Sequence, residues 1–384
     1  MLRHSALRSC LAAVLIALTG ASAQAELQVE IPKVAEMPPA NPYRIYLSDV
    51  SIGHIVDGRL HVIDGDSMRY LGVVATAYAG QAIVSPDRKE IYVATTYYSR
   101  LSSGERTDTV DIHDAQTLTK TGEIIIPPIH AQALHYKGTI RASADGRWLY
   151  VLNATPAISV TVVDLKEKKV ASQVDIPGCW ILLPAASVSN RFSTVCGDGT
   201  LLTVTHDDKG QSVDQQKSAV FFNPDADPIF IHGEQDGDTY RFVSYGGDLY
   251  TANVGGAVAS FEPKWSLLTD KERKAGWRPG GYQLLAQHNA SGRVFVGMHD
   301  GAKVGSHKFP AKEIWGFDLK TKKRITRAPG NNAIAMAVSQ GDKPRLFAYD
   351  GLKAAIASYD ASGPLKLIRR MEGVGETPSL MELH

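Results

Sequence analysis

The sequence predicts an all-β protein built from repeated four-stranded units. Short runs rich in Val, Ile and Tyr, bounded by Asp, Gly, Pro and Ser, recur from Tyr43 to the C-terminus, which is typical of antiparallel strands. Helical periodicity is nearly absent; the exception is Leu267–Gly276, where Thr269 or Asp270 can cap a short helix with Glu272 near its start. The third observation is an internal repeat.

Each copy of the repeat is a strand that ends in an acidic residue, followed by a polar turn and another strand. His61–Asp64 and Val110–Asp114 are clear copies. With two weaker copies included, seven acidic anchors recur at intervals of 42 to 56 residues: Asp64, Asp114, Asp164, Asp207, Glu262, Asp318 and Asp360. Four-stranded units of this length match the blade spacing of a β-propeller and not that of helical solenoids. We therefore predict a seven-bladed β-propeller of four-stranded antiparallel blades over residues 43–384.

The two ends of the predicted propeller supply strands that could close the ring. Arg44–Leu47 precedes the first anchor and Ser379–Leu383 follows the last. Closure protects edges that would otherwise pair with other chains, so we expect one blade to be assembled from both termini. Residues 26–42 contain four prolines and are expected to form an extended N-terminal arm.

Residues 1–25 have the features of a secretory signal peptide. Basic residues precede the apolar run Leu11–Leu18, and Ala23-Gln24-Ala25 provides a small-x-small cleavage pattern, so we expect cleavage after Ala25. The run is too short to span a bilayer, and no later segment is apolar enough to do so. Cys10 lies in front of the run, which argues against a lipid anchor. The mature chain is therefore expected in the periplasm, free of the membrane.

The overall charge excludes some classes of partner. The chain has 41 Lys and Arg against 40 Asp and Glu, a net charge of +1. Such a balance provides no general attraction to nucleic acid or to anionic lipid, so any partner must recognise a local surface.

Two cysteines remain after the signal peptide, Cys179 and Cys196. They bracket two apolar runs, as the arms of a hairpin would. A disulfide between them is the expected state in an oxidising compartment, and two buried thiols are the alternative.

Three histidines, His288, His299 and His307, are the nearest approach to a metal-ligand cluster. Their spacings of 11 and 8 residues match no compact ligand motif, and we interpret them as loop histidines, with no metal site predicted.

Other residues that could carry chemistry also have simpler interpretations. The pairs Gly246–Gly247 and Gly255–Gly256 are expected in turns between strands. Asp225 and Asp227 could act as acid and base, but their Asn- and Pro-rich surroundings favour turn caps. The polar segment Tyr97–Asp108 is longer than a tight turn requires and is expected to be a loop, either functional or merely solvated.

Several stretches resemble the heavy subunit of aromatic amine dehydrogenase and, more distantly, that of methylamine dehydrogenase. They occur in the order and spacing of that family from about Asn41 to the C-terminus, together with the cysteine pair. The strongest are Ser103–Asp108, Asp227–Ile231, Trp265–Leu268, Trp277–Tyr282, His288–Arg293 and Ser306–Trp315.

This resemblance implies a seven-bladed propeller, two copies of which bind two small subunits in an α2β2 heterotetramer. It implies that the small subunit carries tryptophan tryptophylquinone and oxidises primary amines to aldehyde and ammonia. A small copper protein would then accept the electrons. This chain would hold no cofactor and no catalytic residue; it would position the small subunit, exclude water and line the substrate entrance.

The family places an aromatic residue beside the substrate entrance shortly after the first strand. The corresponding stretch here is Val50–His54, which makes Ile52 and His54 the candidate channel residues. Since His54 replaces the aromatic residue, the resemblance does not determine which amine is preferred. The alternative interpretation places both residues in an ordinary loop.

A free-standing periplasmic propeller that binds a protein or small ligand is the alternative function. The repeat supports it equally, and only the family-like stretches favour the amine dehydrogenase subunit. A self-contained propeller enzyme such as a lactonase would need clustered acidic metal ligands, which the sequence does not bring together.

Overall fold

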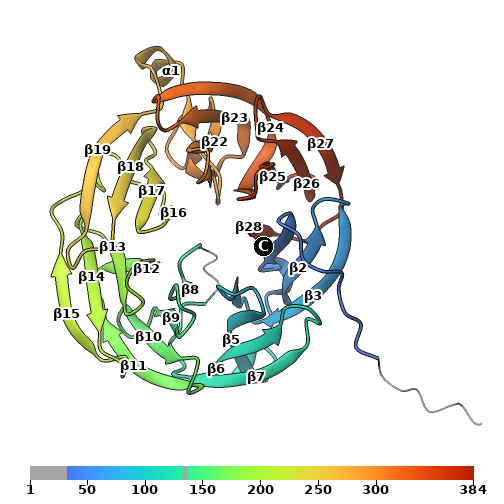
Figure 1. Cartoon of the computed structure of the whole chain (residues 1–384), viewed down its shortest axis with the longest axis vertical. Coiled ribbons are helices and arrows are strands. Elements are labelled where there is room, and N and C mark those ends of the chain that lie inside the picture. Colours follow the sequence, from blue (N-terminus) through green and yellow to red (C-terminus); the bar gives the residue numbers. More distant parts are fainter. Residues whose placement is uncertain (1–32, 133–135) are drawn as a thin grey trace, which may run out of the picture. The chain divides into compact units, whose positions relative to one another are not determined.

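The computed structural model describes residues 33–132 and 136–384 of the chain. It divides into two units, Met1–Ala35 and Glu36–His384, and all the strands of the described residues lie in the second. The predicted signal peptide lies outside the described residues. In the second unit, antiparallel sheets follow one another around a ring in chain order (Figure 1). The all-β prediction is therefore confirmed.

Five of the sheets are four-stranded. The first joins both ends of the chain: β28 (Pro378–Leu383), β1 (Arg44–Asp49), β2 (Gly58–Asp64) and β3 (Arg69–Ala77). The second and third contain β4 (Gln81–Val84), β5 (Glu90–Arg100), β6 (Ser103–Asp114) and β7 (Lys120–Ile126), then β8 (Ile140–Ala142), β9 (Trp148–Asn153), β10 (Ser159–Asp164) and β11 (Lys169–Asp175). The fourth and fifth contain β12 (Cys179–Pro184), β13 (Arg191–Cys196), β14 (Leu201–His206) and β15 (Ser212–Lys217), then β16 (Glu234–Asp236), β17 (Thr239–Val243), β18 (Asp248–Asn253) and β19 (Ser260–Ser266).

The sixth sheet has eight strands and corrects the predicted blade number. Its strands are β20 (Arg278–Pro279), β21 (Leu285–His288), β22 (Arg293–His299), β23 (Ala311–Asp318), β24 (Lys323–Val338), β25 (Arg345–Asp350), β26 (Ala355–Asp360) and β27 (Lys366–Met371). The 16-residue strand β24 pairs with β23 through its first part and with β25 through Ala333–Val338, so the sheet is not interrupted. The structure thus has five four-stranded blades, not seven.

The acidic anchors misled the blade count because they mark turns and not the borders of sheets. Five of the seven are the last residue of a strand, and Asp207 directly follows β14. The carboxylates of these six accept backbone N–H groups two to four residues ahead, as Asp64 does from Asp66 and Ser67. This local hydrogen bonding favours aspartate at the start of the turn, independently of where a sheet begins or ends. Glu262 is misassigned, since it lies within the outer strand β19.

The ring closes as predicted, by pairing of the two ends of the described chain. β1 and β28 are antiparallel, with Ile45 opposite Leu383 and Leu47 opposite Met381. β1 lies between β28 and β2, and β28 is the inner edge strand of this first sheet, so the two ends of the described chain are joined in one blade (Figure 1).

Adjacent sheets pack face to face to form the core. Trp148 and Tyr150 of β9 pack with Phe192 of β13 on the next sheet, and the Tyr150 and Phe192 ring centroids are 4.7 Å apart. Comparable apolar clusters fill the other sheet junctions. Burial of these side chains between sheets is the main driving force that holds the ring together.

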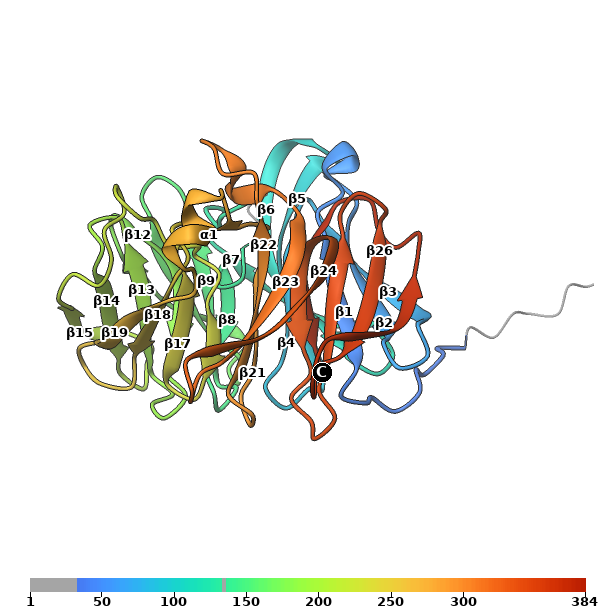
Figure 2. The same cartoon turned by 90° about the horizontal axis from the view of Figure 1, so that it is seen from above.

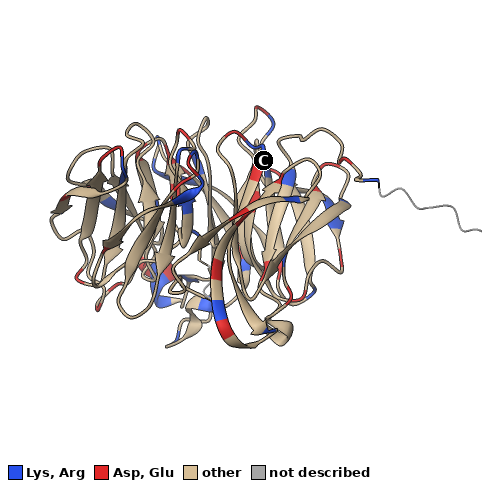
Figure 3. Cartoon of the chain, turned by 90° about the horizontal axis from the view of Figure 1, so that it is seen from below, with Lys and Arg blue, Asp and Glu red and all other residues tan. Residues whose placement is uncertain are grey.

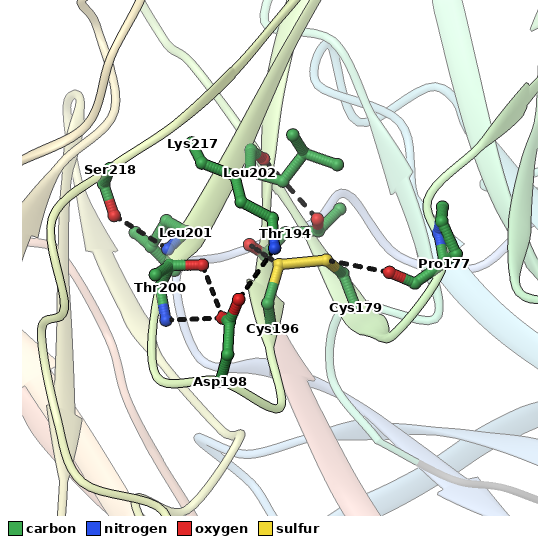
Figure 4. Close-up of a disulfide and its surroundings, with 10 residues drawn as sticks. All are labelled: Pro177, Cys179, Thr194, Cys196, Asp198, Thr200, Leu201, Leu202, Lys217 and Ser218. Atoms are coloured by element: carbon green, nitrogen blue, oxygen red, sulfur yellow. Dashed lines mark hydrogen bonds and ion pairs between the residues drawn. A yellow bond between two sulfur atoms is a disulfide. The ribbon is translucent and has the colours of Figure 1, made fainter.

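The disulfide prediction is confirmed. Cys179 of β12 and Cys196 of β13 are opposite each other in the strand register and are bonded (Figure 4). The nearby Asp198 accepts hydrogen bonds from Thr200 and pairs with Lys217, which fixes the turn after Cys196 (Figure 4). The alternative of two buried thiols does not apply to this structure.

Helices are short and few among the described residues. The predicted helix is α1 (Asp270–Lys274), and Thr269 caps it in a capping box with Glu272. Two 3-10 turns, η1 (Ile52–His54) and η2 (Ser306–Lys308), complete the set. In the described part of the chain no helix is long and apolar enough to cross a membrane.

Charged residues of both signs are interspersed along the ring (Figure 3). Many are engaged locally, as in the pair of Arg370 with Asp350 at 2.9 Å. This distribution agrees with the near-zero net charge and leaves recognition to particular surfaces.

Candidate functional site

The predicted channel residues lie in the connection between β1 and β2. Ser51 adopts a left-handed conformation with φ of 48°, which turns the chain into η1. Ile52 is 68% exposed, and His54 Nδ1 lies 3.0 Å from Glu376 Oε2 in the connection between β27 and β28. The two candidates are therefore at one end of the ring, where both connections meet.

Asp49 joins these two connections. Its buried carboxylate accepts the backbone N–H groups of Ser51 at 2.8 Å, Glu376 at 2.6 Å and Thr377 at 3.0 Å. His61 Nε2 lies 3.3 Å from the same carboxylate. Burial by itself would raise the pKa of Asp49, but the hydrogen bonds from His61 and from the backbone outweigh it and hold the pKa well below its usual range. Asp49 is thus ionised and holds the two connections together beneath η1; we call it the clamp.

A cavity of about 360 Å³ opens beside η1, at the same end of the ring. Ile52 lines it directly, whereas His54 is absent from its wall and contacts the wall residue Glu376. Ile52 therefore lies on the wall of this cavity and His54 lies beside the wall; their role as channel residues stays a prediction. The remaining walls come from distant segments and include Tyr136, Tyr282, Lys308 and Tyr349.

Sequence patterns did not single out these other walls. Tyr282 and Lys308 fall in two of the family-like stretches, but no spacing rule connects them with Ile52. Only the ring closure brings these distant segments together. A tyrosine just before an inner strand is the one signal that could have suggested Tyr282.

The cavity combines aromatic walls with charged groups of both signs. Lys308 Nζ lies 5.4 Å from the centroid of the Tyr282 ring, a cation–π contact. Burial raises the pKa of Tyr349, and its hydroxyl donates to the Val374 carbonyl at 2.9 Å. Glu376 supplies a carboxylate that is partly exposed. Such a site can admit an apolar molecule that carries an ammonium group.

Exposed apolar side chains surround this end of the ring. Ile52, Leu101, Val304 and Leu352 are 68%, 73%, 103% and 74% exposed. They lie in the connections that follow β1, β5, β22 and β25, and each of these is the second strand counted from the inside of the ring. The four connections project on the same side (Figure 2). We call these four residues the apolar rim. Apolar tips gathered on one face are typical of a protein-binding surface.

The polar segment Tyr97–Asp108 is not the loop that we expected. It is the upper part of the β5–β6 hairpin, with register pairs that run from Glu90 opposite Asp114 to Arg100 opposite Ser103, and it carries Leu101 at its tip (Figure 2). The residues from Ser99 to Glu105 at the end of this two-stranded ribbon are exposed, which is why the composition of the segment resembled that of a loop.

A buried carboxylate supports the base of this hairpin. Asp108 contacts Arg106 at 2.6 Å, His130 Nδ1 at 2.7 Å and Thr96 Oγ1 at 2.7 Å. Burial would raise the pKa of Asp108, but the bonds from His130 and Arg106 prevail and lower it to about 2.

We expect Asp108 to make the stability of the protein depend on pH. Because its folded pKa is below the unfolded value, its stabilisation is present above about pH 4 and is lost as the pH falls towards 2, by about 2 kcal/mol. Urea unfolding of the wild type and of Asp108→Asn at pH 6 and at pH 2.5 measures this. The difference between the two proteins should shrink at the lower pH; a difference independent of pH would contradict the assignment.

The other residues that could have carried chemistry take part in structural contacts. His288 contacts Ser291 and the Gly341 carbonyl, and His288, His299 and His307 do not form a group that could hold a metal ion within the described residues. Asp227 accepts the Gly246 N–H at 2.6 Å, so it ties its own run to the distant β17–β18 turn instead of capping a turn of that run.

The remaining turn predictions have a mixed outcome. In the Asn223–Pro228 run Asn223 is the cap, since it accepts the N–H of Asp225. Gly247, with φ of 86°, lies in the β17–β18 turn, and Gly255–Gly256 lie in the β18–β19 connection, as predicted.

Known proteins similar to this chain form one consistent set. The family model described as methylamine dehydrogenase heavy chain (MADH) matches residues 41–383. The methylamine dehydrogenase heavy chain of Methylophilus methylotrophus is 28% identical over 365 residues, covering 94% of this chain and 88% of that protein. The heavy chain of Methylorubrum extorquens is 29% identical over 349 residues, covering 89% and 84%.

Solved structures of low sequence identity share the fold alone. A putative 6-phosphogluconolactonase from Bacteroides fragilis has a TM-score of 0.59 at 9% identity and covers 92% of this chain and all (100%) of that one. A dihydro-heme d1 dehydrogenase has a TM-score of 0.53 at 16% identity, covering 92% and 78%.

The relatives bear out the predicted family, and the closer resemblance to the aromatic amine enzyme stays a prediction. The matched region contains the clamp, the cavity and the apolar rim. The chain belongs to the methylamine dehydrogenase heavy-chain family.

Proposed function

We propose that this chain is the non-catalytic large subunit of a periplasmic quinoprotein amine dehydrogenase that oxidises primary, aromatic amines. Its family identifies it as an amine dehydrogenase subunit, and a heavy chain implies a small-subunit partner in a heterotetramer. The observation that carries the finer proposal is the apolar rim around the cavity that Ile52 lines.

The small subunit docks on the apolar rim. Side chains as exposed as Leu101 and Leu352 are hydrated in the free chain, and covering them with an apolar partner surface releases that water. A partner seated there would also close the cavity beside Ile52. Water would then be excluded from the path between the cavity and the partner's active site.

The cavity is the entrance for the amine. Tyr136, Tyr282 and Tyr349 offer ring faces and edges to an aromatic substrate, and the Glu376 carboxylate attracts its ammonium group. The contact of Lys308 with Tyr282 shows that this ring accepts an ammonium group on its face. His54 orients Glu376 and takes the place of an aromatic channel residue.

The partner subunit supplies the redox chemistry. Tryptophan tryptophylquinone, held by that subunit, would supply the two-electron oxidation of the amine, and a small copper protein would accept the electrons. This chain binds the partner, orients the incoming amine and keeps water away. No step requires a proton transfer by a residue of this chain.

Purification from the periplasm tests the assembly. Leu352→Asp should reduce the co-purifying small subunit by about tenfold to a hundredfold, because an aspartate there must be desolvated on docking. Val213→Asp is the matched control, since Val213 is 64% exposed on the outer strand β15, away from the rim, and should retain the small subunit. Equal retention by both variants would contradict docking at the rim.

The same preparation tests the substrate and the alternative function. With a dye acceptor, kcat/KM should be higher for tyramine or phenethylamine than for methylamine, and Glu376→Gln should raise KM more than it lowers kcat. A colourless monomer, inactive towards all three amines, would instead support the free-standing ligand-binding propeller.

A further inference from the structure

A chain of hydrogen bonds runs through the first sheet, from the outer wall of the ring to the clamp Asp49. Tyr70 lies on the outer strand β3 and is 47% exposed. Its hydroxyl lies 2.8 Å from His61 Nδ1 on the neighbouring strand β2. His61 is 4% exposed, and its Nε2 lies 3.3 Å from Asp49 Oδ2 on β1. The adjacent strands β3, β2 and β1 therefore contribute one member each.

The direction of each bond follows from the charge of Asp49. Because its carboxylate is ionised, it can only accept, so His61 Nε2 carries a proton and donates it. In a neutral ring Nδ1 is then an acceptor, and the Tyr70 hydroxyl donates to it. Burial raises the pKa of Tyr70, which keeps this proton on the hydroxyl. In this arrangement both ring nitrogens of His61 have partners and the ring carries no charge.

The oxygen that His61 contacts also holds the wall of the entrance cavity. Asp49 Oδ2 accepts the backbone N–H of Glu376 at 2.6 Å, and Asp49 Oδ1 accepts the Thr377 hydroxyl at 3.3 Å. That hydroxyl in turn accepts the Ile52 N–H at 3.0 Å. Ile52, Glu376 and Thr377 all line the cavity. The orientation of one carboxylate therefore determines where the backbone of these wall residues lies.

We propose that His61 and Tyr70 are positioning residues for the entrance. His61 fixes the orientation of the Asp49 carboxylate, and Tyr70 fixes the rotation of the His61 ring from the outer wall. Neither residue belongs to the described wall of the cavity, so both act through Glu376 and not on the entering molecule. Their effect on an amine rests on the proposed function, whereas their effect on the backbone of Glu376 does not.

Two substitutions of similar polarity separate the reach of the His61 side chain from its polarity. Glutamine can place an amide N–H where the Nε2 of histidine lies, whereas asparagine is too short to reach Asp49. His61→Asn should accelerate hydrogen exchange at the Glu376 amide by about tenfold to a hundredfold, and His61→Gln should restore part of the protection. Exchange is measured on the protein purified from the periplasm, with the amides of the distant strand β14 as the reference. Equal exchange at Glu376 in the wild type and His61→Asn would overturn the proposal.

Amine kinetics provide a readout that a purely structural role would not move. Tyr70→Phe removes only the hydroxyl and should raise KM for the amine by about threefold to tenfold with kcat nearly unchanged, since only the position of Glu376 is affected. Tyr92→Phe is the control and should retain the wild-type KM, because it removes a hydroxyl that donates to Glu90 at 2.6 Å in the second sheet.

The two readouts fail in different ways. If Tyr70→Phe matched Tyr92→Phe in KM, or lowered kcat with KM unchanged, positioning from the outer wall would be contradicted. If exchange at Glu376 accelerated in His61→Asn while no amine showed a change in KM, the hydrogen-bond chain would hold and the proposed amine entrance would be wrong.

Discussion

Asp49→Asn should lower the free energy of unfolding by about 3 kcal/mol and loosen the entrance to the channel. The carboxylate of Asp49 accepts N–H groups from Ser51, Glu376 and Thr377, two connections that are more than 320 residues apart in the chain. An asparagine keeps the shape but has one acceptor oxygen, and its NH2 group would face donors. Buried donors left without a partner are expensive.

Urea unfolding measures the loss of stability, and hydrogen exchange locates it. Exchange at the amides of Ser51, Glu376 and Thr377 should accelerate, whereas amides in distant sheets should respond only through the global change. Asp57→Asn is the control, because Asp57 is in the same connection but is half exposed, and within the described residues its side chain pairs only with Arg59. A stability loss in Asp49→Asn no greater than in this control would show that Asp49 does not clamp the entrance.

Phe192→Ala should lower the free energy of unfolding by about 3–5 kcal/mol. Phe192 is fully buried on β13 and fills the junction with the neighbouring sheet, where its ring centroid is 4.7 Å from that of Tyr150. Removing the ring loses its transfer free energy and leaves a cavity that the rigid strands cannot close.

Chemical unfolding with two matched substitutions gives the comparison. Phe192→Leu retains most of the volume and should cost less than half as much. Val213→Ala on the outer strand β15 removes an exposed side chain and should change the stability by no more than about 0.5 kcal/mol. If Phe192→Ala cost as little as Val213→Ala, packing between sheets would not be the principal source of stability.

Short-range patterns were enough to predict many parts of the fold. The turn after Asp64, the capping box of Thr269 and Glu272 and the cross-strand pair Cys179–Cys196 each depend on residues less than 20 positions apart. Their hydrogen bonds and covalent bonds demand particular residue types at particular spacings. Such requirements are visible in a linear sequence.

Long-range arrangement limited the prediction of the candidate site. Ile52 was identified through a resemblance and lines the cavity, but the Tyr282, Tyr349 and Glu376 walls could not be inferred. No pattern in the sequence specifies which connections meet when a ring closes.

The sequence by itself determined an all-β chain of repeated strand–turn units, its disulfide, its short helix and the use of both ends to close the ring. Only the tertiary structure decided that five sheets are four-stranded blades and that β24 runs unbroken through an eight-stranded sheet. It also turned the expected loop at Tyr97–Asp108 into a hairpin. The physical reason is that turns are held by neighbours in sequence, whereas the border of a sheet depends on which distant strands hydrogen-bond to each other.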